Sequence, residues 1–142
     1  MSRVTIDELV RLIRQDIPSI AEIGVVFEML GDGLVTARLP FHPSTLRPGG
    51  TISGPTMMGL AGIVVFACVL SRIGMVKDAV TTNLNANFLR KPGPYDLIAE
   101  GRLLKCGRRL AYGEVTMFSE EQPHDVVCHA ICTYSIPTTK SN

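Results

Sequence analysis

Three residues at the start of a long apolar segment could stabilise negative charge during a reaction. Ser53, Gly54 and Pro55 precede the apolar run 57–70, whose length and composition predict a buried helix. The first N–H groups of a helix lack partners within it and lie at its positive end. Gly54 has no side chain to block approach, so its N–H could polarise a carbonyl or hold an oxyanion. Glycine and proline are also common where a loop simply ends and a helix begins, so both interpretations stay open.

Basic side chains supply candidate phosphate-binding groups. Arg108 and Arg109 follow Gly107 in a predicted turn, and Arg90 with Lys91 end a predicted strand, so that they could add to the same patch. Arginine suits bidentate contacts with phosphate. Basic residues in turns are just as commonly exposed to solvent without binding a ligand, so a phosphate-binding patch and an ordinary exposed turn both stay open.

A polar stripe alternates with apolar residues along the predicted strand 80–91. Its members are Asn83, Asn85 and Asn87, with Thr81 on the same side, whereas Val80, Thr82, Leu84, Ala86 and Phe88 form the apolar side. The stripe could line a cleft or meet a partner, and a solvated sheet face explains it equally. The histidines lie far apart in the sequence, so we expect no metal site. Four scattered cysteines are expected to be buried free thiols of a reducing cytoplasm.

The composition limits the class of protein. The chain has 142 residues, of which 46% are hydrophobic and 19% charged, with a formal net charge of +1. That length suits one domain, and so apolar a chain is not disordered. The balanced charge gives no support for a nucleic-acid partner or a polybasic membrane anchor. The excess of apolar residues instead favours a subunit interface.

The elements that must position these residues follow from hydrophobic periodicity. We expect an amphipathic helix over 5–16 with a Thr5–Glu8 capping box, strands over 21–30 and 34–39, a loop over 42–55, and a long helix over 55–73. Strands at 80–91, 97–106, 110–119 and 126–136 follow as an antiparallel meander. The long helix is apolar nearly all round, so the sheet must wrap it. The prediction is a single α+β domain over 1–142, comprising an N-terminal helix (1–18), the central helix and a four-strand meander (80–136).

Four segments together resemble a known family. In order and spacing, 47–60, 81–92, 107–114 and 129–137 are similar to hot-dog fold thioesterases of the PaaI-like branch, within the hydroxybenzoyl-CoA thioesterase superfamily. The resemblance covers about 21–137 and implies a central helix wrapped by a curved antiparallel sheet of about six strands.

The resemblance also implies roles for individual residues. Such proteins hydrolyse acyl-CoA thioesters at a dimer interface, which assigns the oxyanion role to Gly54 and the catalytic carboxylate to the position of Gly62. Arg47 falls where many relatives carry an asparagine near the reacting group, and Thr81 falls where a small hydroxyl positions water. In the family, the turn that corresponds to Gly107, Arg108 and Arg109 lies near the nucleotide of CoA. With Arg90 and Lys91, which could add to that patch, and Asn83 of the polar stripe, these are the candidate CoA-binding residues.

This chain departs from the family pattern at the catalytic position. Gly62 has no side chain to act as nucleophile or base, and no acid occurs between Pro55 and Lys77. Pro55 also removes an N–H that the usual glycine would supply. We therefore expect an acyl- or aryl-CoA thioesterase-like protein of weak activity. The alternative is a non-catalytic protein that binds acyl-CoA or a related ligand. A hydratase is the weakest reading, because the histidine or aspartate expected near the helix is missing.

The resemblance also sets expectations about cofactors, assembly and location. No cofactor is expected beyond the coenzyme A carried by the substrate. The chain should form a homodimer, with a dimer of dimers as a further possibility, in the cytoplasm, and no membrane or nucleic-acid partner is expected.

Overall fold

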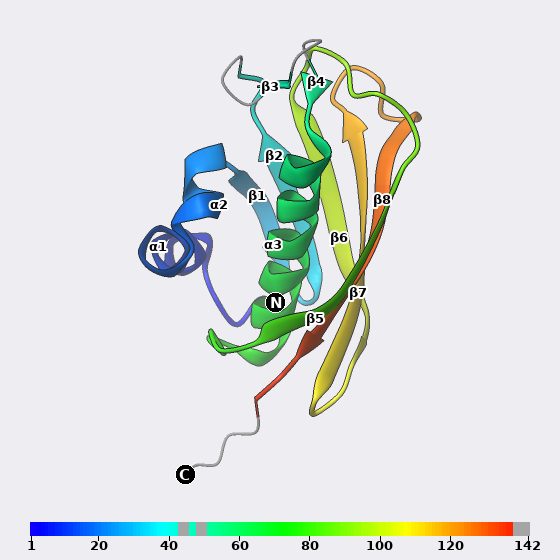
Figure 1. The fold of residues 1–142 in the computed structure, drawn as a ribbon. Coiled ribbons are helices and arrows are strands. Elements are labelled where there is room, and N and C mark those ends of the chain that lie inside the picture. Colours follow the sequence, from blue (N-terminus) through cyan, green and yellow to red (C-terminus); the bar gives the residue numbers. More distant parts are fainter. Residues whose placement is uncertain (43–45, 48–50, 138–142) are drawn as a thin grey trace.

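A curved antiparallel sheet wraps a long central helix. The computed structural model describes residues 1–42, 46–47 and 51–137. The helix α3 (Gly54–Ile73) lies against the concave face of the sheet, and the helices α1 (Ile6–Asp16) and α2 (Pro18–Ile23) lie on the side of α3 away from β7 and β8 (Figure 1). This arrangement confirms the predicted α+β hot-dog architecture and its extra N-terminal helix.

The main sheet has six strands in the order β1-β2-β6-β7-β8-β5. Their bounds are Val26–Gly31 (β1), Leu34–Leu39 (β2), Val80–Phe88 (β5), Leu97–Cys106 (β6), Leu110–Ser119 (β7) and Val126–Ser135 (β8). Two short strands, β3 (Leu46–Arg47) and β4 (Thr51–Ile52), pair with each other within the predicted loop 42–55. Residues 43–45 and 48–50 of that loop lie outside the described residues.

The predicted meander of four sequential strands is wrong for β5. This strand pairs only with β8 and forms one edge of the sheet, whereas β6 pairs with β2 and β7. The Leu89 N–H continues the β5–β8 pairing by donating to the Val127 carbonyl at 2.8 Å. The segment 89–96 then crosses the end of the sheet to reach β6. Strand periodicity indicates which residues are extended but not which strand is the neighbour, because neighbouring strands need not follow in sequence.

The N-terminal region contains a second helix where a strand was expected. The helix α1 has the predicted capping box, with the Thr5 hydroxyl accepting from the Glu8 N–H at 3.1 Å. Pro18 follows the end of α1 and also stands in the first turn of α2. Gly24, at a φ of 77°, caps the C-terminus of α2. The strand expected from residue 21 therefore begins at Val26. Proline lacks an N–H, which the first turn of a helix does not need, so Pro18 suits a helix start.

The core forms where α3 meets the sheet. Residues 63–71 of α3 are all buried, although the helix is long and apolar enough to cross a membrane by length and composition alone. A Cβ at Gly101 of β6 would clash with Cγ1 of Val64, so this glycine permits the close approach of α3 and β6. The long apolar helix is thus the core helix that the sequence predicts.

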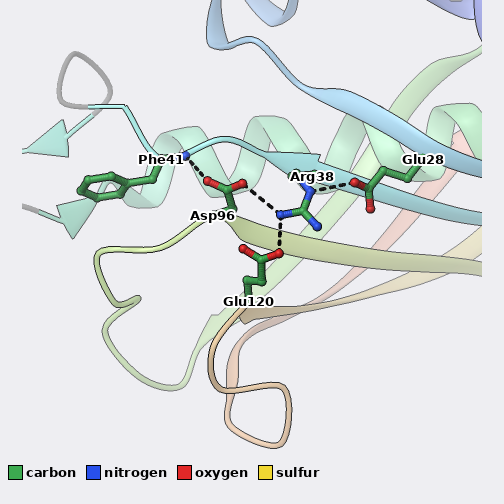
Figure 2. A network of polar contacts seen from close by, with 5 residues as sticks. All are labelled: Glu28, Arg38, Phe41, Asp96 and Glu120. Carbon is green, nitrogen blue, oxygen red and sulfur yellow. Dashed lines mark hydrogen bonds and ion pairs between the residues drawn. The ribbon is translucent and has the colours of Figure 1, made fainter.

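A cluster of charges joins the strands at one end of the sheet. Arg38 of β2 donates to Glu28 at 2.7 Å, to Asp96 at 2.9 Å and to Glu120 at 2.8 Å (Figure 2). Asp96 also accepts the Phe41 N–H at 2.7 Å. That backbone bond and then Arg38 hold the pKa of the Asp96 carboxyl below its usual value. The cluster links β1 and β2 to the segments next to β6 and β7.

Candidate active site

Ser53 and Gly54 stand at the start of α3, where the sequence predicts a helix N-terminus. The hydroxyl of Ser53 caps the helix by accepting the Thr56 N–H at 3.2 Å, and Pro55 stands in the first turn. The helix begins at Gly54, one residue before the predicted start. A Cβ at Gly54 would lie 3.5 Å from the ring of Phe88, at the end of β5. The Gly54 N–H therefore lies at the positive end of α3, beside the aromatic ring of Phe88.

Gly62 lies farther along α3 and opens into a cleft. This Gly62 cleft has a volume of about 300 Å³, and its lining includes Ile17, Ile20, Gly62, Lys77, Thr81 and Tyr134. A Cβ at Gly62 would meet nothing closer than the Tyr134 hydroxyl at 3.8 Å. The cleft thus has room for a side chain at the position where the family resemblance implies a carboxylate.

A hydrogen-bonded pair of hydroxyl groups borders Gly62. The Tyr134 hydroxyl donates to the Gly62 carbonyl at 2.7 Å. Burial raises the pKa of Tyr134 to about 12, and a hydrogen bond with the Thr81 side chain lowers it in part. Tyr134 is therefore protonated at neutral pH and acts as a hydrogen-bond donor rather than a base.

Thr81 joins this group because β5 contains a bulge. The β5–β8 register places Thr81 opposite Tyr134 and Leu84 opposite Cys132, with an irregularity between Thr81 and Asn83. Tyr134 and Cys132 are both buried against the core. Thr81 therefore shares the helix-facing side with Leu84, and the strict alternation predicted for this strand is wrong at Thr81.

The described lining of the cleft includes no acid. Among all the described residues that line it, none is aspartate, glutamate or histidine, and its polar side chains are Lys77, Thr81 and Tyr134. Lys77 lies 3.9 Å from Asp16 of α1, and its side chain is 61% exposed. Hydrolysis of a thioester needs a nucleophile or a base that activates water, and this lining supplies neither.

The structure separates the two predicted parts of the phosphate-binding patch. Arg90 and Lys91 follow β5 at the end near Phe88 and Gly54, and Arg90 pairs with Asp125 at 3.0 Å. Arg108 and Arg109 are exposed in the β6–β7 turn, which Gly107 closes by donating to the Leu110 carbonyl at 2.8 Å. That turn lies at the opposite end of the sheet, beside the start of β5. Within one chain they therefore form two sites, not one.

The remaining predicted residues contribute less to the described site. Asn83 is exposed on β5, and farther along the strand the Asn87 amide donates to Asn85 at 3.4 Å. Arg47 lies in β3, and its side chain is outside the described part of the chain. Of the four cysteines, all free, Cys106 is only half-buried, contrary to expectation.

Sequence reasoning missed two polar residues of the cleft, Tyr134 and Lys77. Tyr134 stands in the segment 129–137 that carries part of the family resemblance, but its contact with Gly62 joins positions far apart in the sequence. Lys77 follows the end of α3, and no local signal indicates that this loop folds back along the cleft.

Comparison with known proteins places these features in a family. A profile described as the Thioesterase superfamily matches residues 49–133, more than half of the chain. The crystal structure of a "putative thioesterase" from Silicibacter sp. TM1040 is similar, with a TM-score of 0.84 and 38% identity over 96% of this chain and 94% of that one. A thioesterase structure from Haemophilus influenzae has a TM-score of 0.84 at 20% identity, covering 98% of this chain and 94% of that one, and shows the likeness of fold.

Two archaeal relatives match over shorter segments. A "putative esterase" of Saccharolobus solfataricus is 30% identical over 98 residues, which is 68% of this chain and 63% of that protein. A second "putative esterase", of Thermoplasma acidophilum, is 24% identical over 86 residues, which is 61% of this chain and 64% of that protein. Each match thus spans less than two thirds of the relative. The profile match and the Silicibacter neighbour establish that this chain belongs to the thioesterase superfamily.

Proposed function

We propose that this protein binds acyl- or aryl-CoA thioesters at a dimer interface and hydrolyses them slowly. Membership of the thioesterase superfamily and the esterase and thioesterase relatives support this substrate class. The observation that carries the proposal is the Gly62 cleft, which has the space for a catalytic carboxylate but no acid among its described lining residues. Water in this cleft would meet hydroxyl groups that orient it but no group that removes its proton.

The spacing along α3 supports a site shared by two copies. Gly54 and Gly62 are eight residues apart, which is about 12 Å along a helix. A single thioester carbon therefore cannot contact both the Gly54 N–H and the cleft of the same chain. A second copy would have to supply one of them.

The free edge of β5 offers a way to bring the two parts together. Gly54 lies beside Phe88 at one end of β5, and Thr81 with the cleft lies at the other end. If two copies pair antiparallel along this edge, Gly54 of one copy comes next to the partner's Thr81. The same pairing places Arg90 and Lys91 beside the partner's Arg108 and Arg109. The two half-patches then combine into one phosphate-binding surface for the nucleotide of CoA.

The second candidate function is ligand binding without hydrolysis. The acid-free cleft favours it, because an orienting site without a base can hold a thioester without cleaving it. Turnover by the wild-type protein separates the two candidates. Assignment to the PaaI-like branch, a cytoplasmic location and the lack of a cofactor other than CoA belong to the same proposal.

The Gly62→Asp variant tests the proposal. The new carboxylate would stand beside the hydroxyls of Thr81 and Tyr134, so the turnover number for short acyl- and aryl-CoA thioesters should rise by about 10²-fold or more, within the contribution typical of a positioned base. Gly62→Asn is the matched control, since it adds the same volume without a base and should stay at the wild-type rate. A folded Gly62→Asp variant that gains no activity would show that this position is not the catalytic one.

A further inference from the structure

The Gly62 cleft presents hydrogen-bond donors and positive charge. The Lys77 side chain carries an ammonium group, and Thr81 and Tyr134 carry hydroxyl groups, while the described lining includes no carboxylate. In relatives, by resemblance, a protein carboxylate occupies this position. Donors with no carboxylate in the described lining favour an anion, and the Asp16 carboxylate, 3.9 Å from the Lys77 ammonium, lies outside that lining.

The space at Gly62 is suited to a small group. A Cβ there would be in ordinary contact with Tyr134, at 3.8 Å, and one turn earlier a Cβ at Gly59 would lie 3.4 Å from Cδ1 of Ile20. Gly59 thus lies in close contact with α2, whereas the position of Gly62 beside Tyr134 stays open.

The walls of the cleft are apolar. The lining includes Ile17 and Ile20 from the α2 region and Ile63 and Phe66 from α3. Such walls suit a short hydrocarbon chain rather than a sugar or a phosphate. The cleft thus combines apolar walls with one cationic and two hydroxyl-bearing side chains.

We propose that the Gly62 cleft binds a carboxylate carried by the acyl group of the ligand, which makes CoA thioesters of short dicarboxylic acids the preferred ligands. This inference rests on the proposed function, because it assigns a substrate class to the same site. The ligand's carboxylate takes the place that a protein carboxylate would occupy in relatives.

The hydroxyl groups can serve such a ligand without leaving a buried group unpaired. Rotation about the C–O bond re-aims the Tyr134 proton from the Gly62 carbonyl toward the cleft. The Gly62 carbonyl keeps the hydrogen bond that α3 itself provides. The Lys77 ammonium has three protons, and its 3.9 Å separation from Asp16 is longer than a hydrogen bond.

Two thioethers of CoA test this inference without hydrolysis. S-carboxypropyl-CoA carries a carboxylate where S-butyl-CoA carries a methyl group, and isothermal titration calorimetry gives the affinity of each. We expect the carboxylated compound to bind about tenfold more tightly, the factor for 1.4 kcal/mol of added interaction.

Three variants locate the carboxylate in the cleft. Lys77→Met should remove the preference by deleting the positive charge, and Gly62→Asp should remove it because its own carboxylate takes the same place and adds a like charge. Lys105→Met, an exposed lysine of β6 outside the cleft, should keep the preference and leave the binding of S-butyl-CoA unchanged.

The outcomes separate this inference from the proposed function. Equal binding of the two thioethers by the wild-type protein overturns the inference and leaves CoA recognition intact. A preference that survives both Lys77→Met and Gly62→Asp also overturns it, because the carboxylate would then bind elsewhere. Failure to bind either thioether contradicts both the inference and the proposed function.

Discussion

At position 62 the chain has a glycine where the family resemblance implies an acid. The hydroxyl groups of Thr81 and Tyr134 nevertheless border this position. The Tyr134 hydroxyl lies 2.7 Å from the Gly62 carbonyl, and Thr81 hydrogen-bonds to Tyr134. Neither hydroxyl can remove a proton from water at neutral pH, since unperturbed hydroxyl groups are weak bases and burial raises the pKa of Tyr134 to about 12. The described lining next to Gly62 therefore supplies hydrogen-bond donors but no acid.

The link between Tyr134 and Gly62 should contribute measurably to stability. Tyr134→Phe removes the hydroxyl that joins β8 to α3, so we expect the free energy of unfolding to fall by about 1 kcal/mol, the typical net value of a hydrogen bond. Urea denaturation measures the change. Tyr112→Phe, at a site that is 43% exposed on β7, is the control and should have little effect. An unchanged unfolding midpoint in Tyr134→Phe would contradict a structural role for this bond.

At the scale of elements, sequence periodicity predicted most helices and strands but not their neighbours. The positions of α3 and of the strands β2 and β6 to β8 follow from local patterns, and the structure contains them. The edge position of β5 and the contact of Tyr134 with Gly62 depend on long-range pairing, which no local pattern encodes. The bulge in β5 turns the Thr81 side chain toward the Gly62 cleft, which it lines.

The charge cluster at Arg38 predicts how stability depends on pH. The pKa of Asp96 is lowered in the folded state, first by the Phe41 N–H and then by Arg38, so its contribution is present above the unfolded pKa. That contribution is lost as the pH falls through the folded pKa, below about 4. Asp96→Asn should cost about 1 kcal/mol at neutral pH and should show less loss of stability than the wild type on acidification. Urea midpoints from pH 7 to pH 3 that stay parallel for the two proteins would contradict this account.

At the scale of the whole molecule, the apolar composition is explained by the core helix and by a free sheet edge. Much of the 46% hydrophobic content lies in α3 and the strands around it. Three large apolar side chains on or beside β5 remain exposed, Val80 at 57%, Phe88 at 47% and Leu89 at 60%. A long edge strand with exposed apolar residues favours pairing with another chain. The subunit interface that the composition favours is therefore placed, as a proposal, along β5.

A proline in β5 tests this interface. Because Leu89 pairs with Val127 through its N–H, the alternation of an antiparallel ladder points the Ala86 N–H toward the free edge. Ala86→Pro removes an interface donor without removing a β5–β8 bond, so we expect a monomer in analytical ultracentrifugation where the wild type is a dimer. Ala86→Val keeps the N–H and should remain dimeric. A folded Ala86→Pro variant that still dimerises would place the interface elsewhere.

The most direct test of the central claim is the steady-state rate at which the wild-type protein releases CoA from short acyl- and aryl-CoA thioesters at neutral pH. With no base or nucleophile among the described lining residues of the Gly62 cleft, we predict a kcat well below about 1 s⁻¹, under the usual range of enzymes. A kcat in the ordinary range of roughly 1–10³ s⁻¹ would contradict the claim that the carboxylate missing at Gly62 limits hydrolysis.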